Sequence, residues 1–383
     1  MLDFPPGTPG ATYTGPNGTT WSWDGAKWLA GTSANVYAPV ASPAFSGNPT
    51  APTPPVGDAD TSLATTQFVS DAVATSLHDV GRNLIHNSMF NVQQRGSGSW
   101  SASGNYTADR WVQFFAGGSM ATSVNPSGDG ARAQTGDESM AYQLYTTFTG
   151  TAGAGDLALM QQNIEGLRRL SGKTVTVSFW AASGTGSKVG VSMDQNFGTG
   201  GSPSALVPGT GQSVTLTGTF ARYSLTFTLP STAGKTFGTN NNDMVQMSFW
   251  FSSGSTYAAR AGNIGAQTGN ISIWGIQLEL GTVATPLEKL DPVTQLQQCQ
   301  RFYQVGNFKS DTYSAAGNAS GVYQSFPVQM RATPVVTPTF NIQTNGASGG
   351  ASAVSIYGVE IYTVATAAGY VTISGPFTAS ADL

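Results

Sequence analysis

Regular alternation of apolar and polar residues marks the middle of the chain. Residues 173–181, 221–230 and 243–253 each place apolar side chains at every second position. Side chains of a strand alternate between its two faces, so each segment has one apolar face and one face of hydroxyl and amide groups. We therefore predict a sandwich of antiparallel sheets, of the jelly-roll type, over residues 82–286. The predicted inward positions are Val175, Val177 and Phe179; Tyr223, Leu225, Phe227 and Leu229; and Val245, Met247, Phe249 and Phe251.

The alternation changes phase within residues 270–281. Ile271 and Ile273 fall in one register, Ile276 begins the other, and Gly275 lies at the change. An extra residue in one strand of an antiparallel pair produces such a slip, and glycine suits the backbone that the slip requires. The pattern predicts a β-bulge at Gly275.

Residues 1–34 predict a small aromatic β-hairpin. Residues 15–18, Gly-Pro-Asn-Gly, are a turn signal between two short aromatic segments. Trp21, Trp23 and Trp28 are more large rings than so short a piece covers by itself. Two compatible interpretations stay open: a small core shared with a neighbouring copy, and a plug that anchors the protein to a larger assembly.

Residues 35–81 predict a thin shaft and then a short helix. Proline recurs too often over residues 36–60 for a central strand or a helix, so this part is expected to be extended. The helix is marginal in water by itself, and packing with two copies as a three-stranded bundle would stabilise it. The alternative is a single helix lying on the next domain. The apolar positions of the helix are Phe68, Val69, Ala72, Val73, Leu77 and Val80.

Residues 287–383 predict a short helix followed by a small β-domain. Asp291 and Pro292 form a helix start, a capping residue followed by proline at the first position. From residue 303 onwards, alternating segments are separated by turns rich in glycine and asparagine. The residues expected along one side of the helix are Val293, Leu296, Cys299 and Phe302.

Charge and cysteine content narrow the classes of function. Charged residues make up 9% of the chain, against roughly 25% in ordinary domains. A net charge of −4 without a basic run excludes nucleic acid as the main partner. No apolar run approaches the roughly 20 residues of a membrane span, and the first residues lack the features of a cleaved export signal. Because no such signal is seen, we expect synthesis in a cytoplasm. Cys299 is the one cysteine, so we expect no disulfide within the chain.

The residues give no recognisable catalytic or metal-binding constellation. His78 and His86 are the two histidines. Asp109-Arg110 beside Trp111 predict a structural ion pair or a turn clamp at a strand start. We expect no enzyme, no cofactor and no bound metal. Carboxylates for glycoside cleavage, whose spacing is spatial rather than sequential, would come from Asp137, Glu138, Asp194 and Glu165.

The large domain opens with a distinctive set of residues, which are Asn83, Leu84, Ile85, Asn87, Phe90, Gln94, Arg95 and Gly96, then Ala108, Asp109, Arg110 and Trp111. This set resembles the opening of a carbohydrate-binding-module-like jelly roll of bacteriophage tail fibres and related tail proteins. The resemblance continues at residues 273–279, Gly281, residues 284–286 and residues 299–303. Other parts resemble a fibre shaft segment (residues 49–54, 57–58 and 64–69), small virion-attachment modules (residues 13–28) and fibre tip domains (residues 330–334).

The resemblance implies a homotrimeric structural protein of the virion, located in the tail and assembled in the host cytoplasm. Its partners would be its own copies, other tail or baseplate proteins through Trp21, Trp23 and Trp28, and a glycan of the host surface. Weak contacts from several copies would combine into avidity. The alternatives are a virion component without a receptor role, such as a baseplate or head decoration, and a polysaccharide depolymerase or secreted carbohydrate-binding module.

Two tryptophans are the candidates for contact with a sugar. Trp180 and Trp250 fall on the otherwise polar faces of their strands, with Gln195 or Arg222 nearby in the pattern. An aromatic face stacks on the apolar side of a pyranose, and planar polar groups bind its hydroxyls. The alternative is that the next subunit of a trimer buries each outward tryptophan.

Overall fold

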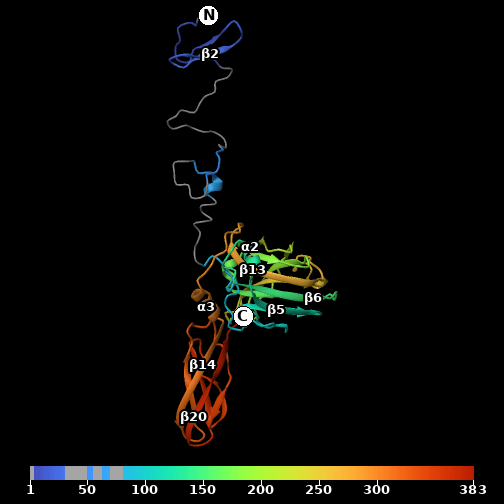
Figure 1. The fold of residues 1–383 in the computed structure, drawn as a ribbon, viewed down its shortest axis with the longest axis vertical. Coiled ribbons are helices and arrows are strands. Elements are labelled where there is room, and N and C mark those ends of the chain that lie inside the picture. The colour runs from blue at the N-terminus through green and yellow to red at the C-terminus, as the bar shows by residue number, and fades with distance from the viewer. Residues whose placement is uncertain (1–3, 31–49, 55–62, 70–80) are drawn as a thin grey trace. The chain divides into compact units, whose positions relative to one another are not determined.

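The computed structural model describes residues 4–30, 50–54, 63–69 and 81–383 (Figure 1). The chain divides into two compact units, Met1–Val73 and Ala74–Leu383. Its regular structure is mainly antiparallel β-sheet, which confirms the predicted fold class. Among the described residues, no helix has the length and apolar character needed to cross a bilayer.

The first unit contains a small antiparallel sheet of β1 (Thr12–Thr14), β2 (Thr20–Trp23) and β3 (Trp28–Ala30). Tyr13 on β1 pairs with Trp21 on β2. The Gly18 N–H donates to the Gly15 carbonyl at 2.9 Å and closes the turn between the two strands. The predicted hairpin is confirmed, and β3 is an addition that the turn signal did not predict.

The second unit begins with a sandwich of two five-stranded antiparallel sheets, ordered β10-β9-β12-β7-β4 and β11-β8-β13-β6-β5. Short helices connect some strands: α2 (Asp129–Thr135) and two 3₁₀ turns, Leu167–Leu170 and Ser255–Tyr257. The strands are β4 (Trp111–Ala116), β5 (Ser119–Pro126), β6 (Tyr142–Thr149), β7 (Leu157–Glu165), β8 (Thr174–Ala182), β9 (Lys188–Asn196), β10 (Gln212–Thr215), β11 (Ala221–Thr228), β12 (Met244–Ser253) and β13 (Thr268–Leu280).

The core between these two sheets contains the predicted inward side chains. Phe179 of β8 and Phe249 of β12 are fully buried and meet edge to face, with ring centroids 5.1 Å apart. The Trp111 ring of β4 also packs on Phe249, with ring centroids 6.1 Å apart. Burying each such ring contributes roughly 2–3 kcal/mol, so the alternation of the sequence translates directly into the sandwich. Tyr223 and Leu225, on edge strand β11, are only partly buried against this core.

The predicted bulge lies in β13. Its pairing with β8 shifts register between Trp274 and Gln277, and Gly275 there has a φ of +62°. Added side-chain atoms at Gly275 would come within 3.1 Å of both Leu287 and Trp180. Glycine therefore meets a conformational and a steric requirement at once.

Helix α3 (Pro292–Gln300) follows the sandwich and begins as predicted. The Asp291 side chain accepts hydrogen bonds from the Val293 and Thr294 N–H groups, each at 3.0 Å. Cys299 is buried, as expected, and so is Phe302 just beyond the helix, but Val293 is 64% exposed. The predicted apolar side is therefore wrong for the first turn of the helix, and Leu296, at 36% exposed, is only partly covered.

The chain ends in a β-domain, called the tip below, whose two sheets are β14-β20-β16 with β17 beside β20, and β15-β19-β18. Phe308, Phe377 and Ile361 belong to the core between them. The strands are β14 (Tyr303–Ser314), β15 (Ala319–Ser325), β16 (Val335–Pro338), β17 (Ile342–Thr344), β18 (Gly346–Ser352), β19 (Gly358–Ala365) and β20 (Gly369–Ser380).

Arginine side chains of the sandwich hold the start of the tip. The Arg95 guanidinium lies 3.6 Å from the centre of the Tyr303 ring. The buried Arg110 guanidinium lies 3.3 Å from the centre of the Phe302 ring. Both arginines also form ion pairs with Asp382. Cation–π contacts of this kind strengthen when they are desolvated, so this junction, called the joint below, is a packed contact rather than a loose linker.

Candidate functional site

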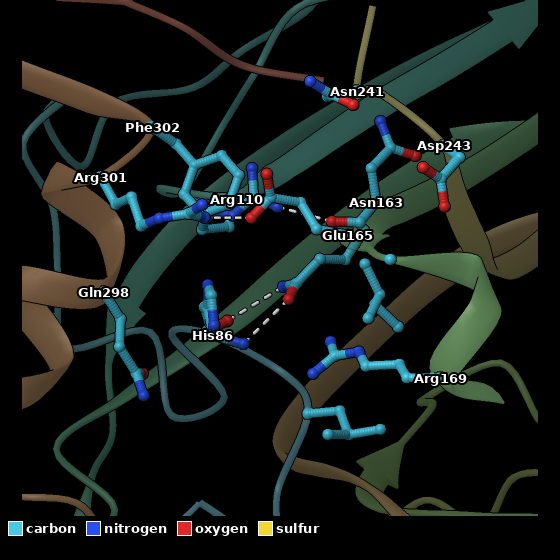
Figure 2. Close-up of a pocket in the computed structure, with 14 residues that line it drawn as sticks. His86, Arg110, Asn163, Glu165, Arg169, Asn241, Asp243, Gln298, Arg301 and Phe302 are labelled. Atoms are coloured by element: carbon cyan, nitrogen blue, oxygen red, sulfur yellow. Dashed lines mark hydrogen bonds and ion pairs between the residues drawn. The ribbon is translucent and has the colours of Figure 1, made fainter. Parts of the chain in front are cut away.

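A cavity of about 520 Å³ opens at the joint, beside the end of β7 and the end of α3 (Figure 2). Polar side chains make up most of its wall. Those at its edge and floor are His86, Arg110, Asn163, Glu165, Arg169, Asn241, Asp243, Gln298 and Arg301, and Phe302 lies behind Arg110. Ligand sites typically have volumes of about 300–1,000 Å³ with a few convergent polar groups, so this cavity is the candidate site.

Several elements bring these groups together. Strand β7 ends at Glu165, which lies opposite Met244 in the pairing with β12 and places the preceding Asp243 at the same edge. The Asp243 carboxylate accepts a hydrogen bond from the Leu167 N–H at 2.9 Å. Helix α3 contributes Gln298, two residues before its end. The site is therefore assembled from segments that are distant in the sequence.

Glu165 is an ionised carboxylate of this cavity. Arg331 donates to it from Nε at 2.8 Å, and Arg301 pairs with its other oxygen. Burial alone would raise the pKa of Glu165, but the hydrogen bonds from Arg331 and Arg301 outweigh it and the pKa is lowered. A carboxyl that donates a proton to a leaving group needs a raised pKa. Glu165 is thus suited to structure and binding rather than to acid catalysis.

His86 is neutral at physiological pH. Burial, and then the positive charges of Arg110, Arg169 and Arg301, lower its pKa to about 3. Its Nδ1 atom is buried and has no hydrogen-bond partner among the described residues. A neutral imidazole carries one nitrogen that accepts hydrogen bonds. His86 therefore offers the cavity a polar group without charge.

Gln298 carries a second buried atom of this kind. Its Oε1 has no hydrogen-bond partner in the described part of the chain. Buried polar atoms of native proteins are normally paired with protein, water or ligand. Together with His86 Nδ1, this oxygen is a buried polar atom without a partner among the residues that the structure describes, on a residue of the cavity wall.

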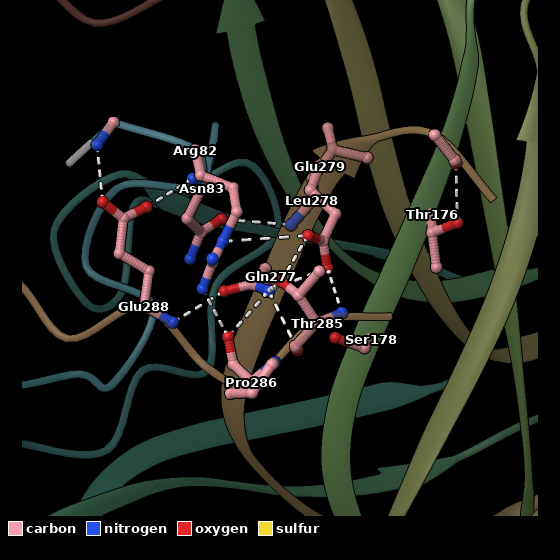
Figure 3. A network of polar contacts seen from close by, with 12 residues as sticks. Arg82, Asn83, Thr176, Ser178, Gln277, Leu278, Glu279, Thr285, Pro286 and Glu288 are labelled. Carbon is pink, nitrogen blue, oxygen red and sulfur yellow. Dashed lines mark hydrogen bonds and ion pairs between the residues drawn. The ribbon is translucent and has the colours of Figure 1, made fainter. Parts of the chain in front are cut away.

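A second polar cluster lies on the outer face of β13 (Figure 3). Asn83 donates to the Ile276 carbonyl and accepts from the Leu278 N–H, both at 3.0 Å. Gln277 donates to Glu279 at 2.8 Å, and the Thr285 N–H donates to the same carboxylate at 2.9 Å. These buried groups bond mainly to one another.

This cluster explains part of the resemblance in physical terms. Asn83 ties the opening strand-like segment to both sides of the bulge, and Glu279 ties β13 to Thr285 in the segment after it. Further along, Asn87 donates to the carbonyls of Val92 and Asp109. The residues of the resemblance that form these bonds fold the domain and do not line the cavity.

The structure brings two predicted sugar-binding residues together. Trp180 on β8 and Arg222 on β11 are cross-strand partners. Trp180 is half-buried and packs in a cluster with Trp274 and Leu287. Arg222 donates to Ser178 Oγ at 3.0 Å. The role of either residue in sugar binding stays a prediction.

Trp250 is on the predicted face of β12 but is covered. It is 1% exposed, with Ala261 and Ile264 packed on it and the Tyr257 ring 5.6 Å away. Its indole N–H donates to Ser192 Oγ at 2.9 Å. The segment between β12 and β13 folds over this part of the sheet. Trp250 therefore presents no face to a sugar, and that prediction is wrong.

Gln195 is also unable to bind a sugar beside Trp250. It is 1% exposed and pairs across strands with Val245, whose side chain is in the core. Cross-strand partners face the same side of a sheet, so Gln195 points away from the face that carries Trp250. Its amide donates to the Pro230 carbonyl at 2.8 Å. The predicted ligand contact of Gln195 is corrected to a structural one.

The predicted attachment residues gather in the first unit. Trp28 stacks on Phe4 with centroids 5.6 Å apart, and Trp23 meets Trp28 edge to face at 5.6 Å. Trp21 meets Phe4 edge to face at 4.9 Å. The three tryptophans stay half-buried, because the rings shield one another only in part. Attachment to other virion proteins stays a prediction.

The predicted trimer helix is described only at its start. Residues 66–69 are helical, and the Thr65 hydroxyl accepts a hydrogen bond from the Phe68 N–H at 3.1 Å, as a cap does. Phe68 is half-buried and Val69 is 49% exposed. The predicted positions that lie outside the described residues are Ala72, Val73, Leu77 and Val80.

The four predicted carboxylates lie in different surroundings. Asp137 pairs with Lys289, Asp194 with Arg260, and Glu138 is exposed. Of the four, Glu165 lines the cavity, where Asp243 accompanies it. In the described part of the chain, no three His, Cys, Asp or Glu side chains gather as a metal site requires. The sequence reasoning missed Arg169, Asn241, Asp243 and Gln298 as residues of the cavity, and no local motif marks them.

Comparisons with known proteins give structural neighbours only. No family model matches this chain, and no curated protein matches its sequence. One neighbour is the enzymatically active domain of tailspike protein 4 of bacteriophage CBA120, with 14% identity over 52% of this chain and a TM-score of 0.30. This chain spans 22% of that tailspike chain.

Other neighbours are carbohydrate-binding modules. A structure described as CBM4 is 18% identical over 51% of this chain and 99% of its own, with a TM-score of 0.30. A family 11 module from Clostridium thermocellum, in complex with a β-1,3-1,4-mixed-linked tetrasaccharide, is 12% identical over 49% of this chain and 98% of its own, with a TM-score of 0.29. Scores this low carry no functional argument, and the sandwich is established by its own strand pairing.

Proposed function

We propose that this chain is a structural virion protein of the tail-fibre type that attaches, as a homotrimer, to a glycan of the host surface. One observation carries the binding role: the polar cavity at the joint, where His86 Nδ1 and Gln298 Oε1 are buried polar atoms without a protein partner among the described residues. The first unit would attach to other tail or baseplate proteins through Trp21, Trp23 and Trp28.

The cavity has the groups that a sugar ring needs. Hydroxyl groups would donate to Gln298 Oε1 and form a hydrogen bond with His86 Nδ1. Neighbouring hydroxyls would accept from the Arg169 guanidinium and donate to the Asp243 carboxylate. A volume of about 520 Å³ accommodates one or two sugar residues. The ligand class that fits this arrangement is a polyhydroxylated one.

Binding, rather than hydrolysis, is the activity that we propose for this cavity. Inverting and retaining glycosidases use one carboxyl as a proton donor, and its pKa must be raised. The pKa of Glu165 is lowered by Arg331 and Arg301 in spite of its burial. The charge state of Glu165 therefore supports an adhesin better than a depolymerase.

The test is a binding screen of the intact protein on a glycan array and on purified bacterial surface polysaccharides. Replacing Arg169 or Gln298 by alanine removes contacts to the ligand and should weaken binding about tenfold in each case. The matched control is Gln297→Ala, an exposed position on the same helix that does not line the cavity. Wild-type affinity in both cavity variants would refute the assignment of the cavity.

A further inference from the structure

Two tyrosines stand together on the outer face of the tip. Tyr313 on β14 and Tyr370 on β20 are cross-strand partners, and their side chains are 69% and 70% exposed. The rings are perpendicular, with an interplanar angle of 90° and centroids 5.7 Å apart. They form a corner with two aromatic faces open to solvent. Large rings are usually well covered in a folded domain, so an exposed pair is informative.

On the same outer face, the cross-strand pair next to the tyrosines is polar. Asp311 and Thr372 are cross-strand partners two residues from the tyrosines, and Thr344 on β17 pairs with Thr372. Because side chains two residues apart share a face, this row borders the aromatic corner. The Thr372 hydroxyl donates to Asp311 Oδ1 at 3.0 Å. Hydrogen-bonding groups thus lie beside the rings.

The turn next to the corner is held in place by one side chain. The Asn345 amide donates to the Ala367 carbonyl at 2.9 Å and to the Tyr370 carbonyl at 3.3 Å. Its oxygen accepts from the Ala367 N–H at 2.9 Å and from the Thr366 hydroxyl at 2.7 Å. These bonds fix the backbone of Tyr370. A ligand that stacks there meets a preorganised surface and loses less free energy in ordering it.

The other exposed apolar residues on the sheet of the corner do not extend it into a protein interface. Val305 and Val335 lie at the joint end of the sheet, and the tyrosines lie about 30 Å further along at ~3.4 Å per residue. Between these valines and the tyrosines lie the cross-strand pairs that contain Lys309 and Asp311. Ile342 pairs with the partner of Lys309 and is a single apolar residue there. Protein interfaces place apolar side chains at the centre and charges at the rim. The arrangement here favours a small ligand.

We infer that Tyr313 and Tyr370 form a second carbohydrate site, specific for a neutral hexose unit and independent of the cavity. The apolar face of a pyranose stacks on one ring and meets the edge of the other, while its hydroxyls bond to Asp311, Thr344 and Thr372. The negative charge of Asp311 disfavours an acidic sugar at the same place. The inference rests on the proposed role in glycan attachment and places a contact at the tip itself.

Saturation-transfer NMR of the full chain with methyl glucopyranoside, galactopyranoside and mannopyranoside tests this site. At least one of these probes should bind, and Tyr313→Ala or Tyr370→Ala should weaken it about tenfold. Tyr313→Phe should keep most of the affinity, because stacking needs the ring. Tyr357→Ala, which removes a ring 60% exposed elsewhere on the tip, is the matched control and should bind as the wild type does.

The outcomes separate this site from the cavity. Arg169→Ala and Gln298→Ala should leave binding of these probes unchanged. The inference is overturned if no probe binds, if the alanine variants bind like the wild type, or if only the cavity variants lose binding. It is also overturned if Tyr313→Ala changes the oligomeric state in mass photometry, because the corner would then be a contact between copies. Loss of array binding by the cavity variants alone would leave the proposed function intact.

Discussion

Glu165 makes the joint sensitive to acid. The carboxylate belongs to the sandwich, whereas its partners Arg301 and Arg331 come from the part of the chain that leads into and forms the tip. Its folded pKa is lower than the ordinary value of 4.5. The stability that these ion pairs contribute is therefore fully present above pH 4.5 and is lost as the pH falls through the folded pKa.

Glu165→Gln should lower the stability of the second unit at pH 7 by about 1–2 kcal/mol, since the pairs are partly solvent-exposed. The difference between variant and wild type should shrink as the pH falls below 4.5 and through the lowered pKa of the folded wild-type carboxyl. Urea unfolding at pH 7 and at pH 3 measures this. Glu138→Gln, at an exposed site, is the control. A difference that is equal at both pH values would show that the ion pairs are not its cause.

Single residues also show where sequence reasoning reaches its limit. The alternation of β12 placed Trp250 on the correct face, because the period of a strand is local. Its burial depends on Ala261 and Ile264, which return over the sheet from a loop. Gln195 was predicted to contact a ligand before the register of its strand was known. The pairing with Val245 fixes that register and the face of the sheet on which Gln195 lies. The strand face of a residue was therefore predictable from the sequence. The loop that covers it and its cross-strand partner were not.

At the scale of elements, the bulge in β13 positions the polar cluster on the outer face of that strand. It moves Gln277 and Glu279 onto the outer face, where Asn83 and Thr285 meet them (Figure 3). The change of hydrophobic phase predicted this bulge at the correct residue. The sequence could do so because an inserted residue inverts the pattern of every position after it.

Gly275→Ala should destabilise the second unit by roughly 1–3 kcal/mol, because the residue has a left-handed backbone and its Cβ would crowd Leu287 and Trp180. Thermal unfolding measures the effect. Gly218→Ala is the control, since a Cβ there meets nothing within 4 Å and the backbone is outside the left-handed region. Equal melting temperatures for the two variants would contradict this account of the bulge.

The elements of the cavity were less predictable than those of the sandwich. Helix α3 was expected from its cap and proline, and β8, β11 and β12 from their alternation. Asn241, Asp243 and Arg169 lie on connections without a periodic pattern, and Gln298 is one of several glutamines on α3. Only the three-dimensional arrangement brings these residues to one wall. A polar cavity formed by connections therefore leaves little trace in the sequence.

At the scale of the whole molecule, attachment would depend on several weak sites in each chain and on several chains. The joint is packed through Arg95 and Arg110, and the tip carries its own aromatic corner. Each site is small and partly open, which is typical of weak binding to sugars. When several linked sites bind at the same time, the overall affinity rises although each single site binds no more tightly. The predicted trimer is therefore the property on which strong attachment would rest.

The trimer prediction is tested by placing a charge in the predicted bundle. Val73→Asp and Val80→Asp should convert a trimer to monomers in mass photometry, because three carboxylates would be forced together at the bundle axis. His78→Asp, which does not change any of the predicted apolar positions of the helix, should stay trimeric. Binding to a glycan-coated surface should fall by about 10²–10⁴ in the monomeric variants, whereas affinity for a monovalent sugar should not change. A wild-type chain that is monomeric over a wide concentration range would contradict the trimer, and attachment would then have to come from the individual sites alone.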